Sequence, residues 1–119
     1  MDNKLIAMSK FGIYTDKSDI SFDTHLAGLE EQTRQLLLTL RTFIKSLGDN
    51  VIEEIRPHRI VYAKTLNFRT FVDIQPRNDS LVISVERGRN EPTSSEVIDS
   101  RSRLDAIKKQ IANAYNTIR

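Results

Sequence analysis

The chain contains no cysteine, only four glycines, and no apolar run long enough for a membrane span. Without cysteine it has no disulfide framework, no thiolate metal site and no cysteine nucleophile. The glycines, at positions 12, 28, 48 and 88, are too scattered for a phosphate loop or a dinucleotide-binding fingerprint. A transmembrane helix needs about 20 apolar residues, and residues 5–8 are too short an apolar stretch for a signal peptide. We therefore expect a cytoplasmic protein with no contact with the membrane.

Sequence motifs for catalysis and metal binding are also missing. No Gly-x-Ser-x-Gly nucleophile motif occurs. His25 and His58 each lack a second imidazole at metal-ligand spacing, so we predict no metal site and no cofactor. A nuclease that uses an acid-x-lysine pattern would need a lysine two residues after Asp73 or Glu86, where glutamine and glycine stand. The sequence therefore favours a protein without catalytic residues.

The distribution of charge along the chain is uneven. The 119 residues carry a net charge of +2. Residues 1–55 hold six basic and nine acidic residues, whereas residues 56–119 hold twelve basic and seven acidic residues. A basic half of a domain is typical of a protein that binds nucleic acid or another anion, although a solvated surface would look the same. The candidate anion-binding residues are Arg56, Arg59, Lys64, Arg69, Arg87 and Arg89.

Two stretches have the apolar periodicity of an amphipathic helix. Residues 29–47 place leucines, Phe43 and Ile44 at spacings of three, four and seven, which predicts one buried stripe. Gly48 follows directly and is expected to be the C-cap of this helix. Residues 24–28 predict a short helical turn that Gly28 ends. The second long helix is expected from Leu104 to the end of the chain.

Between the two helices the sequence alternates as strands do. Strands are predicted at 51–55, 59–64, 68–75 and 80–86, with 96–98 as one further short candidate. The fold class is therefore α+β: two layers, an antiparallel meander of three or four strands, and an N-terminal and a C-terminal helix packed on one sheet face. We assign residues 23–119 to this single domain and leave residues 1–22 as an N-terminal segment.

The outer sheet face is the second candidate site. Alternation over residues 68–75 places Phe71 outward, and alternation in the next strand does the same for Val82. An outward aromatic ring beside arginine can stack on bases and hold phosphate. Alternatively, Phe71 is covered by the N-terminal segment or by a second copy of the domain, which would make Phe71 and Val82 the interface of a homodimer or protein-interaction module. A third alternative is a small metal-dependent hydrolase that uses Glu53, Glu54 or Asp73.

The order of several short motifs resembles a known family. The matching stretches are residues 23–26 (DTHL), 40–51 (LRTFIKSLGDNV), 59–64 (RIVYAK), 67–68 (NF), 73–76 (DIQP) and 104–115. Together they resemble the domain of unknown function found at the C-terminus of bacterial and archaeal proteins labelled "predicted transport protein". That family has a longer segment with a tryptophan before its last strand, whereas this chain has no tryptophan.

The resemblance implies the same order of helix, meander and helix, and it implies no catalytic residues. Members that occur beside nuclease-like domains suggest an accessory role near nucleic acid. From the residues and the resemblance together, we expect a small non-catalytic binding or accessory domain. Its expected partner is nucleic acid, and self-association or a protein partner is the alternative.

Overall fold

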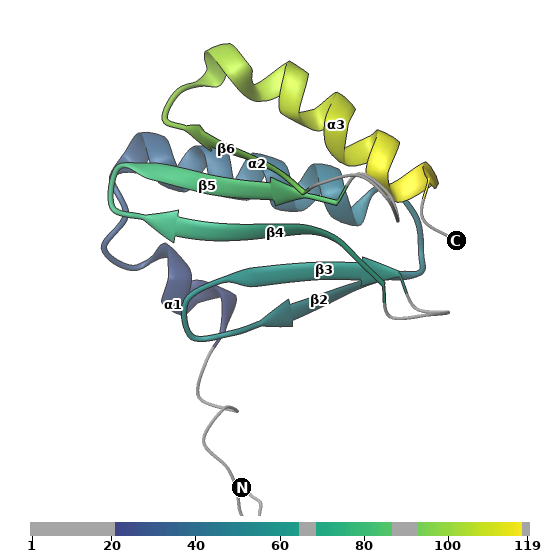
Figure 1. The fold of residues 1–119 in the computed structure, drawn as a ribbon. Helices are drawn as coiled ribbons and strands as arrows, with labels where there is room; N and C mark the ends of the chain where they lie inside the picture. Colours follow the sequence, from purple (N-terminus) through teal and green to yellow (C-terminus); the bar gives the residue numbers. More distant parts are fainter. Residues whose placement is uncertain (1–20, 65–68, 87–92, 118–119) are drawn as a thin grey trace, which may run out of the picture.

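The computed structural model describes residues 21–64, 69–86 and 93–117 of the chain. In chain order its elements (Figure 1) are α1 (Phe22–Leu26), α2 (Glu31–Lys45), β2 (Val51–Ile55), β3 (Ile60–Lys64), β4 (Arg69–Arg77), β5 (Ser80–Val85), β6 (Ser94–Ile98), the 3-10 turn η2 (Arg101–Arg103) and α3 (Leu104–Thr117). None of the helices in these ranges is long and apolar enough to cross a lipid bilayer.

The five strands form one antiparallel sheet in which each strand pairs with its neighbour in sequence. This confirms the predicted α+β meander with a helix before and after it. In the part of the chain that the structure describes, the sheet has five strands rather than three or four, because the short candidate at residues 96–98 extends back to Ser94 and pairs with β5 along its whole length.

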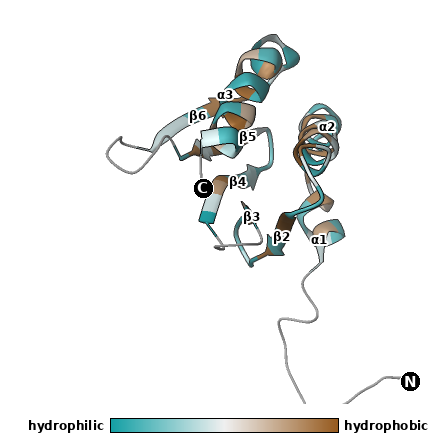
Figure 2. Ribbon diagram, turned by 90° about the vertical axis from the view of Figure 1, so that its right-hand side faces the viewer, coloured by the Kyte–Doolittle hydropathy of each residue, from teal (hydrophilic) through white to brown (hydrophobic). Residues whose placement is uncertain are grey.

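The hydrophobic core lies between the sheet and the helices α2 and α3, which share one side of the strand layer (Figure 2). The apolar stripe of α2 is buried as its spacing predicts, and α3 buries a corresponding stripe. The strands contribute alternate residues to the same core: Ile60, Tyr62, Val72, Ile74, Leu81, Ile83, Val85 and Ile98. The opposite face of the sheet, called the outer face below, is not covered by any described helix.

α1 forms as the sequence predicts, although it starts slightly earlier. Ser21 and Thr24 form a reciprocal capping box at its start. Gly28 follows the helix with a φ of 83°, a conformation that favours glycine because it has no Cβ. Phe22 is buried in the core, so the packed domain includes residue 22.

A β-bulge in β4 changes which way Phe71 points. Tyr62 pairs with Val72 and the next residue, Ala63, pairs with Thr70, so Phe71 is the extra residue on β4. Phe71 is fully buried and its ring meets the ring of Tyr115 edge to face, with centroids 5.3 Å apart. The prediction that Phe71 faces outward is therefore wrong, because strict alternation does not continue through a bulge.

Candidate functional site: an arginine corner on the outer sheet face

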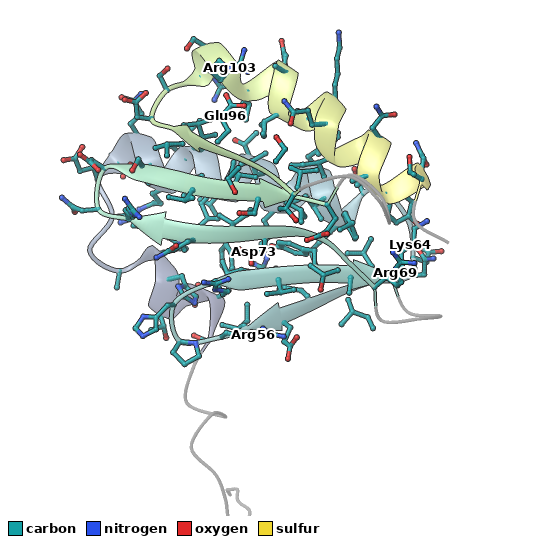
Figure 3. The ribbon with its side chains drawn as sticks, viewed as in Figure 1. Arg56, Lys64, Arg69, Asp73, Glu96 and Arg103 are labelled. Atoms are coloured by element: carbon teal, nitrogen blue, oxygen red, sulfur yellow. The ribbon has the colours of Figure 1, made fainter. Side chains whose placement is uncertain are left out.

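The predicted basic residues lie at opposite ends of the sheet (Figure 3). Arg56 and Arg59 flank the turn between β2 and β3, whereas Lys64 and Arg69 are partners at the other end of β3 and β4. The length of β3, at about 3.3 Å per residue, separates the two groups. Arg87 and Arg89 lie outside the described residues. The four predicted basic residues that the structure describes therefore do not form a single patch.

Arg56 and Arg59 are held at the β2–β3 turn by backbone contacts and by two ion pairs. The turn is closed by the Arg56 amide, which donates to the Arg59 carbonyl at 2.9 Å. His25 of α1 lies against the same turn, with its Nε2 2.7 Å from the Arg56 carbonyl oxygen. Arg56 Nη2 lies 2.9 Å from Glu54 Oε1, and Arg59 Nη1 lies 2.9 Å from Asp73 Oδ2. Each of the two arginine side chains is about half exposed although it is paired.

The strand register adds a third arginine to this end of the outer face. Ile74 faces the core opposite Ile60, so Asp73 and the alternate residue Arg77 share the outer face. Arg77 is the last residue of β4, pairs with Ser80 and is exposed. We call Arg56, Arg59 and Arg77 the arginine corner. The sequence suggested only a turn at residues 76–79, but the alternation from Asp73 could have placed Arg77 with the others.

Lys64 belongs to a different structure, a cluster around Tyr115 in the last turn of α3. The Lys64 Nζ lies 4.3 Å from the centre of the Tyr115 ring, at the helix end where a cation opposes the negative pole of the dipole. The Tyr115 hydroxyl donates to the side-chain oxygen of Asn50. Lys64 therefore helps to fix the end of α3 against the sheet, and it lies away from the arginine corner.

The acidic residues proposed for a hydrolase are already paired. Glu53 receives two hydrogen bonds from Arg41, from Nε and Nη2, both at 2.8 Å, and a third from the Tyr62 hydroxyl at 2.7 Å. Glu54 and Asp73 are the carboxylates paired with the arginine corner. Within the described ranges, no three residues of the His, Cys, Asp and Glu types form a group that could hold a metal ion. These contacts give the three carboxylates structural roles.

The Glu53 network is largely buried, and both this burial and its hydrogen bonds affect the pKa values of Glu53 and Tyr62. Burial would raise the pKa of Glu53, but the hydrogen bonds from Arg41 and Tyr62 and the nearby cations outweigh burial and hold that pKa below its ordinary value of 4.5. Burial, followed by the hydrogen bond to Glu53, raises the pKa of Tyr62 above its ordinary value of 10.0. Glu53 is therefore a carboxylate and Tyr62 a neutral phenol at neutral pH.

A separate cleft of about 550 Å³ opens between β5, β6 and α3. Its polar lining includes Glu86, Ser94, Gln110 and Asn113. Glu86 accepts a hydrogen bond from the Thr93 hydroxyl at 3.1 Å. The cleft lies at the opposite end of the sheet from the arginine corner, and its described lining contains none of the predicted site residues that the structure describes.

Comparison with known proteins does not assign the chain to a family. The chain matches no family model, and neither a curated protein nor a solved structure is significantly similar to it. The candidate function therefore depends on the geometry alone.

Proposed function

We propose that this domain binds the phosphate backbone of nucleic acid through the arginine corner, without catalysing a reaction. The observation that supports the proposal is the register of β2, β3 and β4. That register gathers Arg56, Arg59 and Arg77 at one end of a sheet face that no described helix covers. Guanidinium groups suit phosphate because their planar fork can donate two parallel hydrogen bonds.

The ion pairs within the corner are compatible with this role. Exposed ion pairs contribute between about 0 and 1 kcal/mol, because water screens the charges and two long side chains must be ordered. A phosphate oxygen can therefore replace Glu54 or Asp73 as the partner of its arginine at small cost. Glu54 and Asp73 keep the guanidinium groups that they pair with oriented on the outer face until a ligand binds.

The chemistry of the corner favours contacts to the backbone over the reading of bases. Tyr62 of β3, Phe71 of β4 and Tyr115 of α3 all pack into the core between the sheet and the helices. Base stacking on a sheet requires outward aromatic rings. We therefore expect binding that depends little on sequence and strongly on salt.

The test is a titration of labelled single- and double-stranded DNA and RNA with the protein at low and at physiological salt. The variant R56A/R59A/R77A should lose most of the affinity. For duplex DNA, the plot of the logarithm of the binding constant against the logarithm of the salt concentration should become shallower, with a slope smaller in magnitude by about 0.9 for each phosphate contact that is lost. Circular dichroism and thermal unfolding would show that the variant still folds, since all three side chains are exposed.

A matched control changes the net charge equally at another place. The variant R34A/R101A/K109A removes three exposed cations on α2, η2 and α3, away from the outer face. It should bind nearly as tightly as the original chain. Equal losses in both variants would mean that binding follows net charge only, and no binding at low salt would refute the proposal altogether.

A further inference from the structure

β6 is the edge of the sheet that lies farthest from the arginine corner. It pairs with β5 through all five of its residues, and within the described ranges no strand lies along its other side. The helices α2 and α3 cover the core side of the sheet rather than this margin (Figure 2). An edge strand presents backbone N–H and C=O groups that can pair with a further strand.

The opposite edge, β2, has features that prevent pairing with another copy of itself. Glu53 and Glu54 are consecutive in it, and Pro57 follows two residues after its end. The Glu54 side chain is 58% exposed on the outer face. The Glu54 and Arg56 side chains are each about half exposed at this edge, and exposed charges and proline both oppose the pairing of edge strands.

β6 has none of these protective features. Its sequence, Ser94-Ser95-Glu96-Val97-Ile98, contains neither lysine nor proline, and its register with β5 is regular. Its one charge is neutralised within the same chain. Arg103 donates two hydrogen bonds to the Glu96 carboxylate, from Nε to Oε2 at 2.5 Å and from Nη2 to Oε1 at 3.1 Å. Figure 3 shows the two side chains next to each other. The charge that would repel a second β6 is therefore already compensated.

Val97 gives this edge an apolar surface on its outer side. Its relative exposure is 60%, the highest of the large hydrophobic residues that the structure describes. The register with β5 places it beside Val82, the outward residue predicted as part of an interface. The two side chains form a short apolar row that ends at the open margin of the sheet.

We propose that two copies of this chain associate through β6, antiparallel, with Val97 of one copy opposite Val97 of the other. The row of two valines would then continue into the same row of the second copy. Shifting the pairing of the two β6 strands by two residues would place Val97 opposite Ser95. A shift of one residue would place outward side chains opposite core-facing ones. The apolar pattern therefore favours the register with Val97 opposite Val97. The arginine corner lies near the other edge and stays accessible, so the dimer does not depend on the proposed function.

The first experiment measures the oligomeric state by sedimentation equilibrium from about 10 µM to about 1 mM, which covers weak protein association. The original chain should form a dimer in this range. Val97→Lys should weaken association at least about 10-fold, since an edge lysine opposes pairing and two lysines would face each other. Glu54→Lys on the β2 edge is the matched control and should leave the dimer intact. A chain that stays monomeric throughout, or a dimer that Val97→Lys leaves unchanged, would overturn the proposal.

The second experiment uses the absence of cysteine in the chain. Directly opposite residues of antiparallel strands have Cα atoms about 4.5 to 5.5 Å apart, within the range of a disulfide. Val97→Cys should therefore cross-link to a covalent dimer on mild oxidation. Glu54→Cys, equally outward on the other edge, should cross-link far more slowly. Equal rates for the two variants would mean random collision and would refute the β6 interface.

Discussion

Glu53 connects three elements of the domain through its one carboxylate. It lies on β2, receives two hydrogen bonds from Arg41 of α2, and receives a third from Tyr62 of β3. Arg41 in turn stacks on the ring of Phe22 in α1, with its guanidinium carbon 3.8 Å from the ring centre. The Glu53 side chain is only 11% exposed, so its charge depends on these partners.

The pH dependence of stability should report this network. Because the pKa of Glu53 is lowered in the folded chain, its contribution to the free energy of unfolding is complete above about pH 4.5 and is lost as the pH falls below that. Glu53→Gln should cost about 2 kcal/mol at pH 7, since it leaves the Arg41 charge without a carboxylate. Urea unfolding between pH 3 and pH 8 should show that this cost shrinks toward pH 3. A cost that is independent of pH would contradict the role of the Glu53 charge.

Gly48 has a different role from the one its position suggests. The sequence predicts a helix C-cap, but the C-cap of α2 is Ser46, and Gly28 is the described glycine with a positive φ. A Cβ on Gly48 would overlap the Tyr115 hydroxyl and come within 2.9 Å of the Asn50 side-chain oxygen. Glycine is therefore needed here for close approach of α3, and the backbone conformation does not require it.

Gly48→Ala should accordingly destabilise the domain by about 1 to 3 kcal/mol through overpacking. The double-mutant cycle with Tyr115→Phe tests the cause, because the phenylalanine ring lacks the hydroxyl that the new methyl group would meet. We expect the cost of Gly48→Ala to be clearly smaller in the Tyr115→Phe background, as measured by chemical denaturation. Additive costs in the two backgrounds would show that Tyr115 is not the obstacle.

Among the strands, β4 shows how a single irregularity changes a site. Its bulge falls at Phe71 and turns that ring to the core, where it packs against Tyr115 of α3. The alternation resumes at Val72, so the outward positions of Asp73 and Arg77 are those of a regular strand. A bulge depends on how β3 and β4 pair, and neither strand alone reveals it.

α2 begins without a side-chain cap. Its N-cap is Glu30, whose backbone has the extended conformation of a cap residue but whose side chain makes no cap hydrogen bond. Aspartate has a shorter side chain that can accept from the first-turn amides. Glu30→Asp should therefore raise the free energy of unfolding by about 0.5 to 1 kcal/mol in chemical denaturation. Glu30→Gln is the control without a cap; an equal gain there would assign the effect to something other than capping.

In the molecule as a whole, the two sheet faces have separate roles. The core face packs against α2 and α3, and polar groups on it, such as those of the Glu53 network, form hydrogen bonds between elements of the same chain. The outer face presents the arginine corner near β2 and an apolar margin at β6. Both proposals use this face, at opposite edges, so a β6 dimer would present two arginine corners on one extended sheet.

The sequence predicted two of the three arginines of the arginine corner, but it did not predict which residues form the complete set. Arg56 and Arg59 were predicted as anion contacts, and they lie together because they flank one tight turn. Lys64 and Arg69 are close to them in sequence but are separated by the length of a strand. Arg77 joins the corner because it alternates with Asp73 on the outer face of β4, and the interpretation of residues 76–79 as a turn concealed that alternation.

The amphipathic stripes of α2 and α3 and the alternation of the strands were sufficient to establish an α+β meander with helices on one face. Those patterns are local, since they follow from where each side chain points along its own helix or strand. Strand pairing and close packing decided the rest: the inward turn of Phe71, the partners of Glu53, the space that Gly48 leaves for Tyr115, and the edge at β6 that no described strand covers. Each of these depends on which residue of a distant segment lies opposite, and a periodic pattern carries no information about that partner.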